Sequence, residues 1–368
     1  MKNKNVRRLT MQAVAHIWKA IPKFDPSSVK EGRWLIDSFL AEGSIQLIYG
    51  EHGSFKSTCL LAAARAVSDG EAFLGMETRQ RVVLYLDYEN PPDVIKSRNQ
   101  DMKLGLPGRR FVIWDRFTGK QTPTPDDPAL EQFVKICVKK TGKGPWLIFD
   151  SWSSLLKAGE GGETTGQVAP VYAAIRRLCD VGATCSMIDH SRKYQPNVLY
   201  GGADKMTKVD TLHNFVVHKS PESPRPSRFR EVVVRVDSWL KRYSPRGQGV
   251  FSFEVRSEKD AKGRWHITDL RPAKDPIEVK KNRRIGILRD LIREHPGLGQ
   301  TALANLAADT NAMGQNVAME LLRKGIGRYW SASPARGRKL VFKVLKPVKS
   351  QESENKREKA ANLKKLKK

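Results

Sequence analysis

Short, unbroken apolar runs alternate with longer helical patterns between residues 44 and 190 of this chain. The expected strands are 45–49, 82–86, 111–114, 146–149 and 184–188, and the expected helices are 59–67, 130–138 and 171–178. Apolar runs of this length are typical of strands that are buried on both faces of a parallel sheet. The pattern therefore predicts an α/β fold with a mostly parallel sheet flanked by helices.

The pattern changes after residue 210, where longer segments of alternating polarity predict hairpin-like strands. The expected strands are 211–218, 231–239, 250–255 and 264–270. Such strands would extend the same sheet as an antiparallel edge. The stretch 219–228 contains three prolines and predicts a loop.

The C-terminal quarter has a third pattern, with helical spacing in 282–294, 300–308 and 315–324 and short β segments at 329–331 and 340–344. Three short helices followed by a basic-tipped hairpin predict a small winged helix-turn-helix. The domains are therefore expected to be an N-terminal extension (1–40), the α/β core (41–270), a linker (271–280), the winged helix (281–345) and a basic, disordered tail (346–368).

Charge is the strongest compositional feature, because 66 Lys and Arg against 39 Asp and Glu give a net charge of +27. Residues 271–368 carry 24 of those basic residues and only 9 acidic ones, so over half of the excess lies there. A chain of this kind accumulates on polyanions, of which nucleic acid is the commonest. An anionic membrane is the rival partner, but no apolar run of transmembrane length and no basic amphipathic helix with an exposed aromatic face is evident.

The four cysteines are scattered, and each lies in an apolar run; they are Cys59, Cys137, Cys179 and Cys185. No pair has metal-ligand spacing, so reduced core residues are expected, and neither zinc nor a disulfide framework is. The opening residues show no signal-peptide pattern. We therefore expect a cytoplasmic protein.

The segment 50–58 lies between a predicted strand and a predicted helix. It fits G-x-x-x-x-G-K-[ST] except that Phe55 replaces the second glycine. Such a loop aims backbone N–H groups and a helix N-terminus at phosphates, while the lysine neutralises charge and the hydroxyl binds Mg²⁺. ATP and Mg²⁺ are the expected ligands, and the alternative is a plain strand-to-helix turn. The predicted nucleotide-binding residues are Gly50, Gly53, Ser54, Phe55, Lys56, Ser57 and Thr58.

A carboxylate, Asp150, ends the apolar run 146–149. Hydrolysis needs a second Mg²⁺ contact besides the hydroxyl of Ser57, and a strand-terminal Asp can provide it. The alternative is that Asp150 only caps the following turn. The phosphate loop upstream favours the metal role.

Polar residues also follow two other strands. Glu89 comes after 82–86 and can polarise the attacking water, with Asp87 as the competing candidate. His190 follows 184–188 and can sense the γ-phosphate, or it can be a strand-end histidine that bonds to the backbone.

The phosphate loop followed by Glu89, Asp150 and His190, each at a strand end, resembles the RecA-like ATPase core. The resemblance covers roughly residues 30 to 256 and is strongest to plasmid-type RepA hexameric helicases and related phage ATPases, relatives of the DnaB replicative helicases. Some members of that group share the Ser-Phe-Lys-Ser form of the loop. The resemblance implies that Lys56 and Ser57 bind the phosphates and Mg²⁺, Glu89 is the catalytic base, Asp150 is a direct or indirect Mg²⁺ ligand and His190 is the γ-phosphate sensor.

The resemblance also implies a Lys-x-Arg pair near the end of the core that reaches into the neighbouring subunit's site. Lys241 and Arg242, with Arg246 close by, lie in a similar context, although their spacing departs from that pattern. The alternative is that these charges decorate a solvated hairpin.

DNA contacts are expected in two places. In the resembling group, loops facing a central channel contact single-stranded DNA, and here they correspond to 156–168 and 194–208. In the winged helix, 315–324 would be the recognition helix against duplex DNA, although such modules also dock proteins. The predicted DNA-binding residues are Lys193, Lys205, Lys208, Gln315, Asn316, Arg323, Arg336, Arg338 and Lys339.

These expectations combine into an ATP-hydrolysing DNA motor that assembles as a homo-oligomeric ring. Its sharpest form is a hexameric replicative helicase of a plasmid, phage or mobile element. The alternatives are a DNA-binding regulator that is switched by ATP, and a loader or recombination ATPase that does not unwind DNA.

Overall fold

The computed structural model describes residues 33–102, 110–115, 121–155, 165–200, 203–219, 229–241, 251–311, 313–335 and 339–345. The chain divides into two compact units, Met1–Phe215 with Asp237–Gly249, and Val216–Val236 with Val250–Lys368. Each unit is described by itself.

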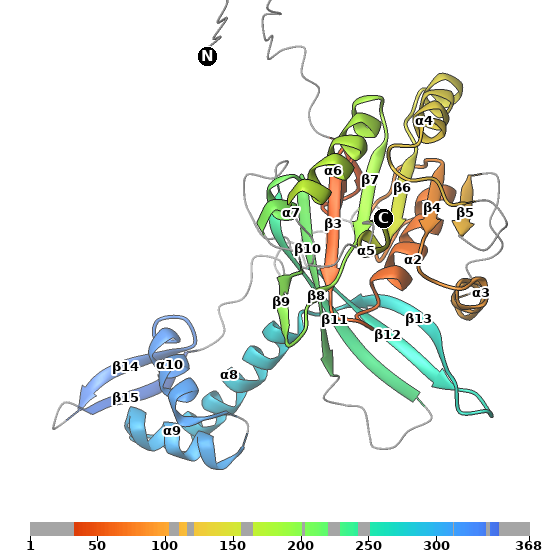
Figure 1. The fold of residues 1–368 in the computed structure, drawn as a ribbon. Helices are drawn as coiled ribbons and strands as arrows, with labels where there is room; N and C mark the ends of the chain where they lie inside the picture. The colour runs from red at the N-terminus through yellow and green to blue at the C-terminus, as the bar shows by residue number, and fades with distance from the viewer. Residues whose placement is uncertain are drawn as a thin grey trace, which may run out of the picture. The chain divides into compact units, whose positions relative to one another are not determined.

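The first unit is built on a parallel sheet with the strand order β10-β3-β7-β6-β4-β5 (Figure 1). Every neighbouring pair in this series is parallel, which confirms the predicted α/β fold with a mostly parallel sheet. Its strands are β3 (Ile45–Gly50), β4 (Val83–Asp87), β5 (Phe111–Asp115), β6 (Trp146–Asp150), β7 (Thr184–Ile188) and β10 (Thr211–Lys219), of which β10 continues into the second unit.

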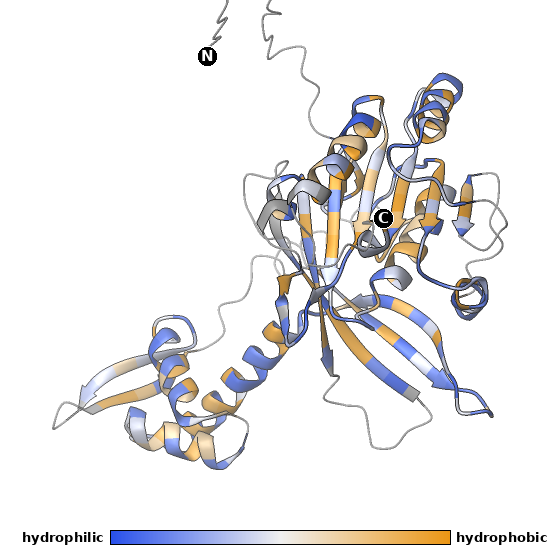
Figure 2. Cartoon of the chain, in the orientation of Figure 1, coloured by the Kyte–Doolittle hydropathy of each residue, from blue (hydrophilic) through white to orange (hydrophobic). Residues whose placement is uncertain are grey.

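Helices cover both faces of this sheet. Helix α2 (Lys56–Asp69) packs against β3, β4 and β5, whereas α6 (Thr165–Asp180) packs against β3 and β7 and contacts α4 (Pro128–Thr141). The strands β3, β4, β6 and β7 are therefore buried along their whole length, and Figure 2 shows the central strands as predominantly hydrophobic.

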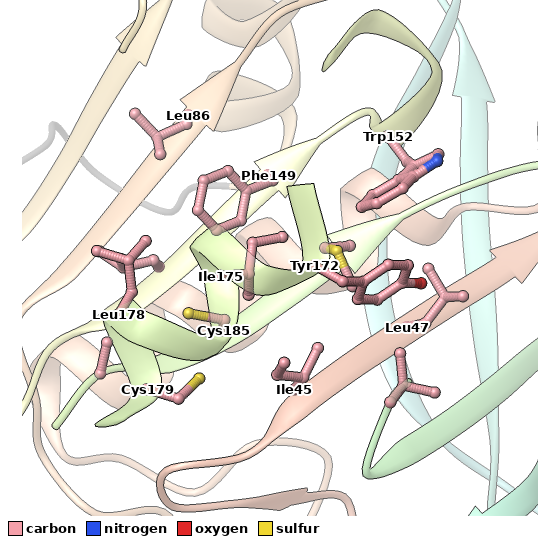
Figure 3. Close-up of a cluster of buried hydrophobic side chains, with 14 of the residues drawn as sticks. Ile45, Leu47, Leu86, Phe149, Trp152, Tyr172, Ile175, Leu178, Cys179 and Cys185 are labelled. Carbon is pink, nitrogen blue, oxygen red and sulfur yellow. The ribbon is translucent and has the colours of Figure 1, made fainter. Parts of the chain in front are cut away.

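Alternate residues of the strands build the larger core cluster, because side chains along a strand point to opposite faces in turn. Ile45 and Leu47 of β3, Phe149 of β6 and Cys185 of β7 meet α6 at Ile175 (Figure 3). The residues between them point to the α2 face, where Asp87 and Asp150 also lie.

All four cysteines, Cys59, Cys137, Cys179 and Cys185, are buried and free. Their predicted place in the core is therefore confirmed.

The remaining elements of the first unit are short. Four strands form two antiparallel hairpins, β1 with β2 and β8 with β9. Their bounds are β1 (Trp34–Ile36), β2 (Leu40–Ala41), α3 (Pro92–Asp101), α5 (Trp152–Leu155), β8 (Ser191–Arg192), β9 (Gln195–Leu199) and α7 (Ala203–Thr207).

The second unit contains an antiparallel ladder in which β12 (Phe251–Lys259) pairs with both β11 (Phe229–Lys241) and β13 (Trp265–Ala273). The predicted linker 271–280 is wrong, because β13 continues to Ala273 and helix α8 (Pro276–Glu294) begins three residues later. The Asp275 side chain caps that helix by accepting a hydrogen bond from the Ile277 N–H, and Pro276 occupies its first turn.

A small helical module follows along the chain. It contains α8, α9 (Gln300–Asp309), α10 (Gln315–Lys324) and a hairpin of β14 (Trp330–Ala335) and β15 (Lys339–Val344). The three helices share a core with the hairpin at Trp330, whose indole N–H donates to Leu322 O at 2.7 Å. The element order follows the prediction, but α8 starts six residues before the predicted 282 and β14 ends four residues after the predicted 331.

Several predicted features lie outside the described residues, namely most of the N-terminal extension (1–32), the proline-rich loop from 220 to 228 and the basic tail (346–368). Within the described ranges, no helix has both the length and the hydropathy needed to cross a bilayer.

Two glycine substitutions give opposite expected effects on stability. A Cβ on Gly144 would lie 1.6 Å from the backbone O of Gly182, whereas one on Gly286, inside α8, meets no heavy atom within 4 Å. Gly144→Ala is expected to lower the free energy of unfolding by about 1–3 kcal/mol through overpacking. Gly286→Ala is expected to raise it by roughly 0.5–1 kcal/mol. Urea titrations followed by circular dichroism measure both free energies of unfolding. Equal stabilities of the two variants would contradict the close packing of Gly144 against Gly182.

Candidate functional site

The candidate residues converge because β3, β4, β6 and β7 are parallel and end at one edge of the sheet. Asp87, the last residue of β4, lies opposite Asp150, the last residue of β6. Strand β7 lies between β3 and β6 in the sheet, so His190 emerges between the phosphate loop and Asp150. Four segments that are far apart in sequence thus contribute to one site.

The loop between β3 and α2 needs glycine at its first position. A Cβ on Gly50 would lie 2.6 Å from the backbone O of Phe215 and 2.8 Å from Ser54 Oγ. Gly53 has φ +73°, in the left-handed region that glycine adopts without steric cost. Both glycines are therefore explained by the path of the backbone.

Phe55 occupies the left-handed region as well, with φ 63° and ψ 21°. This is the conformation that a second glycine would adopt freely, and for an ordinary residue it costs roughly 1–2 kcal/mol. The loop therefore keeps the backbone path of the motif although the sequence departs from it. Neither a side-chain cap nor an acidic residue in the first turn occupies the N-terminus of α2, which leaves that end suited to an anion.

The Lys56 side chain is folded into the loop. Its Nζ donates to Gly50 O at 2.9 Å, to Glu51 O at 2.8 Å and to Ser54 Oγ at 3.2 Å. Burial lowers the pKa of Lys56 to about 8, against the opposing charges of Asp150 and other carboxylates. The ammonium group therefore lies at the centre of the loop, where phosphate oxygens would be received.

Asp150 is buried and fixed by hydroxyl groups. Tyr85 Oη donates to its Oδ2 at 2.6 Å, and the carboxylate also accepts a hydrogen bond from Ser57. Burial raises the pKa of Asp150 and, together with the charge of Asp150, raises the pKa of Asp87 to about 6. The peptide bond between Asp150 and Ser151 is cis.

The contact between Ser57 and Asp150 fits a Mg²⁺ site, because hydroxyl and carboxylate oxygens are the ligands that Mg²⁺ prefers beside water and phosphate. Among the residues that the structure describes, no group of three or more His, Cys, Asp or Glu could hold a metal ion.

Asp87 and Glu89, the two candidates for the base, have different surroundings. Asp87 is 1% exposed and accepts hydrogen bonds from the backbone N–H groups of Glu89 and Asn90. The Glu89 side chain is 43% exposed, and its Oε2 accepts a hydrogen bond from Ser151 Oγ at 2.6 Å. Asp87 therefore shapes the turn, while Glu89 is accessible to water.

Glu89 is paired with a histidine. His190 Nε2 lies 3.9 Å from Glu89 Oε2. Interaction with His190, followed by the hydrogen bond from Ser151, lowers the pKa of Glu89 to about 2. The carboxylate is ionised near neutral pH, so it can accept a hydrogen bond from a water molecule and orient it.

Three contributors were missed from the sequence: Tyr85, Ser151 and His52. The His52 ring stacks on the His190 ring, with centroids 3.9 Å apart and an interplanar angle of 24°. Ser151 could have been found from its position next to Asp150, but nothing in the sequence pairs His52 with His190.

Lys205 requires a correction. Its side chain is fully buried, and its Nζ donates to Asp189 Oδ2 at 2.7 Å and lies 5.5 Å from the centre of the Trp152 ring. The charge of a carboxylate at the end of β7 draws the lysine inward, so the predicted DNA contact of Lys205 is not supported.

Lys193 and Lys208 are exposed. Lys193 Nζ lies 5.3 Å from the centre of the Tyr194 ring, at the turn between β8 and β9, and Tyr194 is 86% exposed. Most of the other predicted channel loop, 156–164, lies outside the described residues.

The predicted DNA-binding residues of α10, Gln315, Asn316 and Arg323, are all exposed. Gln315 Nε2 donates to Asn305 Oδ1 of α9 at 2.7 Å. Outside the described part lie Arg242, Arg246, Arg336 and Arg338, together with the side chains of Lys241 and Lys339.

Comparison with known proteins adds a family match. Residues 19–196, a little under half of the chain, match the family described as "AAA domain". The matched segment contains the phosphate loop, Glu89, Asp150 and His190, and it indicates a nucleotide-binding P-loop ATPase domain.

Among solved structures, a KaiC-like protein from the hyperthermophilic archaeon Pyrococcus horikoshii is similar, with 15% identity, a TM-score of 0.41 and coverage of 67% of this chain and 98% of that chain. At these values the likeness supports no statement about function. No curated protein matches this chain.

The strained backbone at Phe55 predicts how substitutions there behave. Phe55→Gly and Phe55→Asn are expected to keep the affinity for nucleotide within about threefold, because both residues tolerate the left-handed region. Phe55→Val is expected to weaken binding by about tenfold or more, since a β-branched residue is a genuine outlier there. Titration with a fluorescent ATP analogue measures the series. Equal affinities for the Val and Gly variants would show that this conformation is not needed for binding.

The pKa of Lys56 predicts a pH dependence of nucleotide binding. Below about pH 8 the free protein already carries the ammonium group that phosphate requires, so the affinity is expected to stay constant with respect to this group. Above about pH 8, binding must take up a proton, and the affinity is expected to fall by up to about tenfold per pH unit. Titrations from pH 6.5 to 9.5 measure this, with Lys56→Arg as the control, because a guanidinium stays charged throughout. A wild-type profile without a break near pH 8 would contradict the prediction.

Proposed function

We propose that this protein is an ATP-driven DNA motor of the ring-forming replicative helicase type, acting in the cytoplasm on the DNA of a plasmid, phage or mobile element. The observation that carries the proposal is the convergence of Lys56, the Ser57–Asp150 pair and the ionised Glu89 at one edge of a parallel sheet. A cation, a place for a metal and a base are the groups that phosphoryl transfer to water requires. The match of residues 19–196 supports the ATPase part.

Each residue then has a task in hydrolysis. Lys56 neutralises the phosphate charge beside the N-terminus of α2, and Ser57 with Asp150 would hold Mg²⁺. When bound, Mg²⁺ neutralises charge on the phosphate oxygens. Glu89 orients and polarises the attacking water, since it is ionised and accessible.

His190 contacts Glu89 on one side and His52 of the phosphate loop on the other. It is therefore in a position to respond when the γ-phosphate leaves. The hairpin β8–β9 begins directly after His190, so the response would pass to a segment that carries Lys193 and Tyr194.

That hairpin supports a contact with single-stranded DNA in a central channel. An exposed aromatic ring next to cations suits a nucleic acid strand, because bases stack on the ring while the cations contact phosphates. Lys193 is the cation beside the Tyr194 ring, and Lys208, an exposed lysine that precedes β10 outside the hairpin, is the second cation proposed for the strand.

The helical module supports a contact with duplex DNA. The order of three helices and a hairpin is that of a winged helix, in which α10 would be the recognition helix with Gln315, Asn316 and Arg323 toward the bases. The hairpin residues Arg336, Arg338 and Lys339 would contact phosphates, in keeping with the basic charge of this part of the chain.

Assembly into a homo-oligomeric ring, with six subunits in the replicative helicase type, would complete the site. Lys241 or Arg242 would then supply a cation to the neighbouring subunit's γ-phosphate, which stabilises the developing charge. Hydrolysis would depend on closed cyclic contacts between subunits.

The test compares wild type with Glu89→Gln in ATP hydrolysis, with and without DNA, and in unwinding of a forked duplex. Glu89→Gln is expected to lower hydrolysis by about 10²- to 10⁴-fold while nucleotide binding persists, because the variant lacks only the base. Glu71→Gln is the matched control, since it removes an exposed carboxylate beyond the C-terminal end of α2, and Lys56→Ala is expected to abolish hydrolysis.

The outcomes separate the candidate functions. DNA-stimulated hydrolysis without unwinding would refute the helicase form and favour a loader or recombination ATPase. Nucleotide binding without hydrolysis in the wild type would favour an ATP-switched regulator. Normal hydrolysis by Glu89→Gln would mean that another residue is the base.

A further inference from the structure

A second pocket lies at the opposite edge of the first unit's sheet, where β3, β4, β6 and β7 begin. Its volume is about 370 Å³. Since these strands contain five or six residues, the pocket is separated from the nucleotide site by roughly 16–20 Å. The residues that matter for its chemistry are Arg33, Glu42, Arg79, Arg81, Lys143 and Gly144.

Positive charge is in excess in this pocket. Four cationic side chains line it, and among the described lining residues Glu42 is the single acidic one. Glu42 Oε1 accepts a hydrogen bond from Arg81 Nη2 at 2.5 Å and lies 3.8 Å from Arg79 Nε. One carboxylate therefore faces more cations than it can neutralise.

Arg81 is held within this excess. Its side chain is only 9% exposed. Burial lowers the pKa of Arg81, the charges of Arg79 and Arg33 lower it further, and Glu42 opposes them. The three guanidinium groups thus act on one another, and a bound anion would relieve their repulsion.

Glycines contribute much of the remaining lining of the pocket, namely Gly43, Gly142, Gly144 and Gly182. The backbone at Gly182 packs so closely against Gly144 that a Cβ on Gly144 would not fit. Next to them, the N–H of Gly43 donates to Thr184 Oγ1 at 2.9 Å, which ties the start of β3 to the start of β7. The cavity is therefore preformed and is not filled by side chains.

We propose that this pocket binds the phosphate group of a small phosphorylated molecule, such as a nucleotide, independently of the phosphate loop. Guanidinium groups match phosphate oxygens in a bidentate manner. A volume of this size is at the lower end of small-molecule sites, which run from about 300 to 1,000 Å³. The ligand is thus of nucleotide size, and the site is a candidate for control of the ATPase by a second anion.

The test uses the full chain with Lys56→Ala, so that binding at the phosphate loop is weakened, and calorimetric titration with pyrophosphate, ADP and a ten-nucleotide oligothymidylate. Pyrophosphate or ADP is expected to bind with one saturable site per chain. Adding Arg79→Gln and Lys143→Gln, two exposed positions, is expected to weaken that binding by about tenfold or more, since two charge-assisted contacts are lost.

The matched control adds Lys96→Gln and Lys135→Gln, which remove the same charge from exposed positions of α3 and α4 and are expected to leave the affinity unchanged. Equal weakening by both pairs, or no saturable binding of either small ligand, would overturn the proposal. Pocket-dependent binding of the oligonucleotide alone would overturn the assignment to a small molecule. None of these outcomes depends on whether the protein hydrolyses ATP or unwinds DNA.

Discussion

The ammonium group of Lys56 is the charge around which the catalytic edge is arranged. It is buried, yet its three hydrogen bonds satisfy it within the loop, and the carboxylates of Asp150, Asp189 and Glu89 counter the cost of its burial. Those carboxylates are in turn held by Tyr85, Lys205 and Ser151. Because a buried charge is costly unless it is paired, the ends of the strands depend on one another, and a change at one alters the electrostatics of all.

Much of the first unit could be predicted because its strands are buried on both faces. Runs such as 45–49 and 146–149 then carry a strong apolar signal, and parallel strands bring their polar ends to one edge, so Lys56, Glu89, Asp150 and His190 were placed together correctly. What failed depends on contacts that are distant in sequence. The burial of Lys205 depends on Asp189, and the role of His52 depends on stacking against His190. The local sequence around Lys205 and around His52 does not distinguish them from solvent-exposed residues.

Phe55 shows a different limit. From the sequence, a phenylalanine in place of glycine counts against the motif, yet the chain accepts the left-handed conformation at that residue. A sequence motif lists the residue types that adopt a given backbone conformation at the lowest energetic cost. A bound phosphate contacts the backbone itself, so another residue can serve if it adopts the same conformation. The prediction of a linker at 271–280 was wrong for a local reason. Prolines and charged residues are typical of linkers, but they also occur at the ends of strands and the starts of helices, as Pro272 and Pro276 do here.

The pair of Lys205 with Asp189 also affects the segment between them. Asp189 precedes the hairpin β8–β9 and Lys205 follows it, while the Tyr200 N–H donates to His190 O at 3.1 Å. These two contacts hold the chain on both sides of the hairpin at its base, whereas Tyr194 lies at the opposite end, in the turn. Binding of a partner at this turn would cost less conformational entropy than binding to an untethered loop of the same length. A displacement of the turn would also be transmitted directly to the C-terminal end of β7.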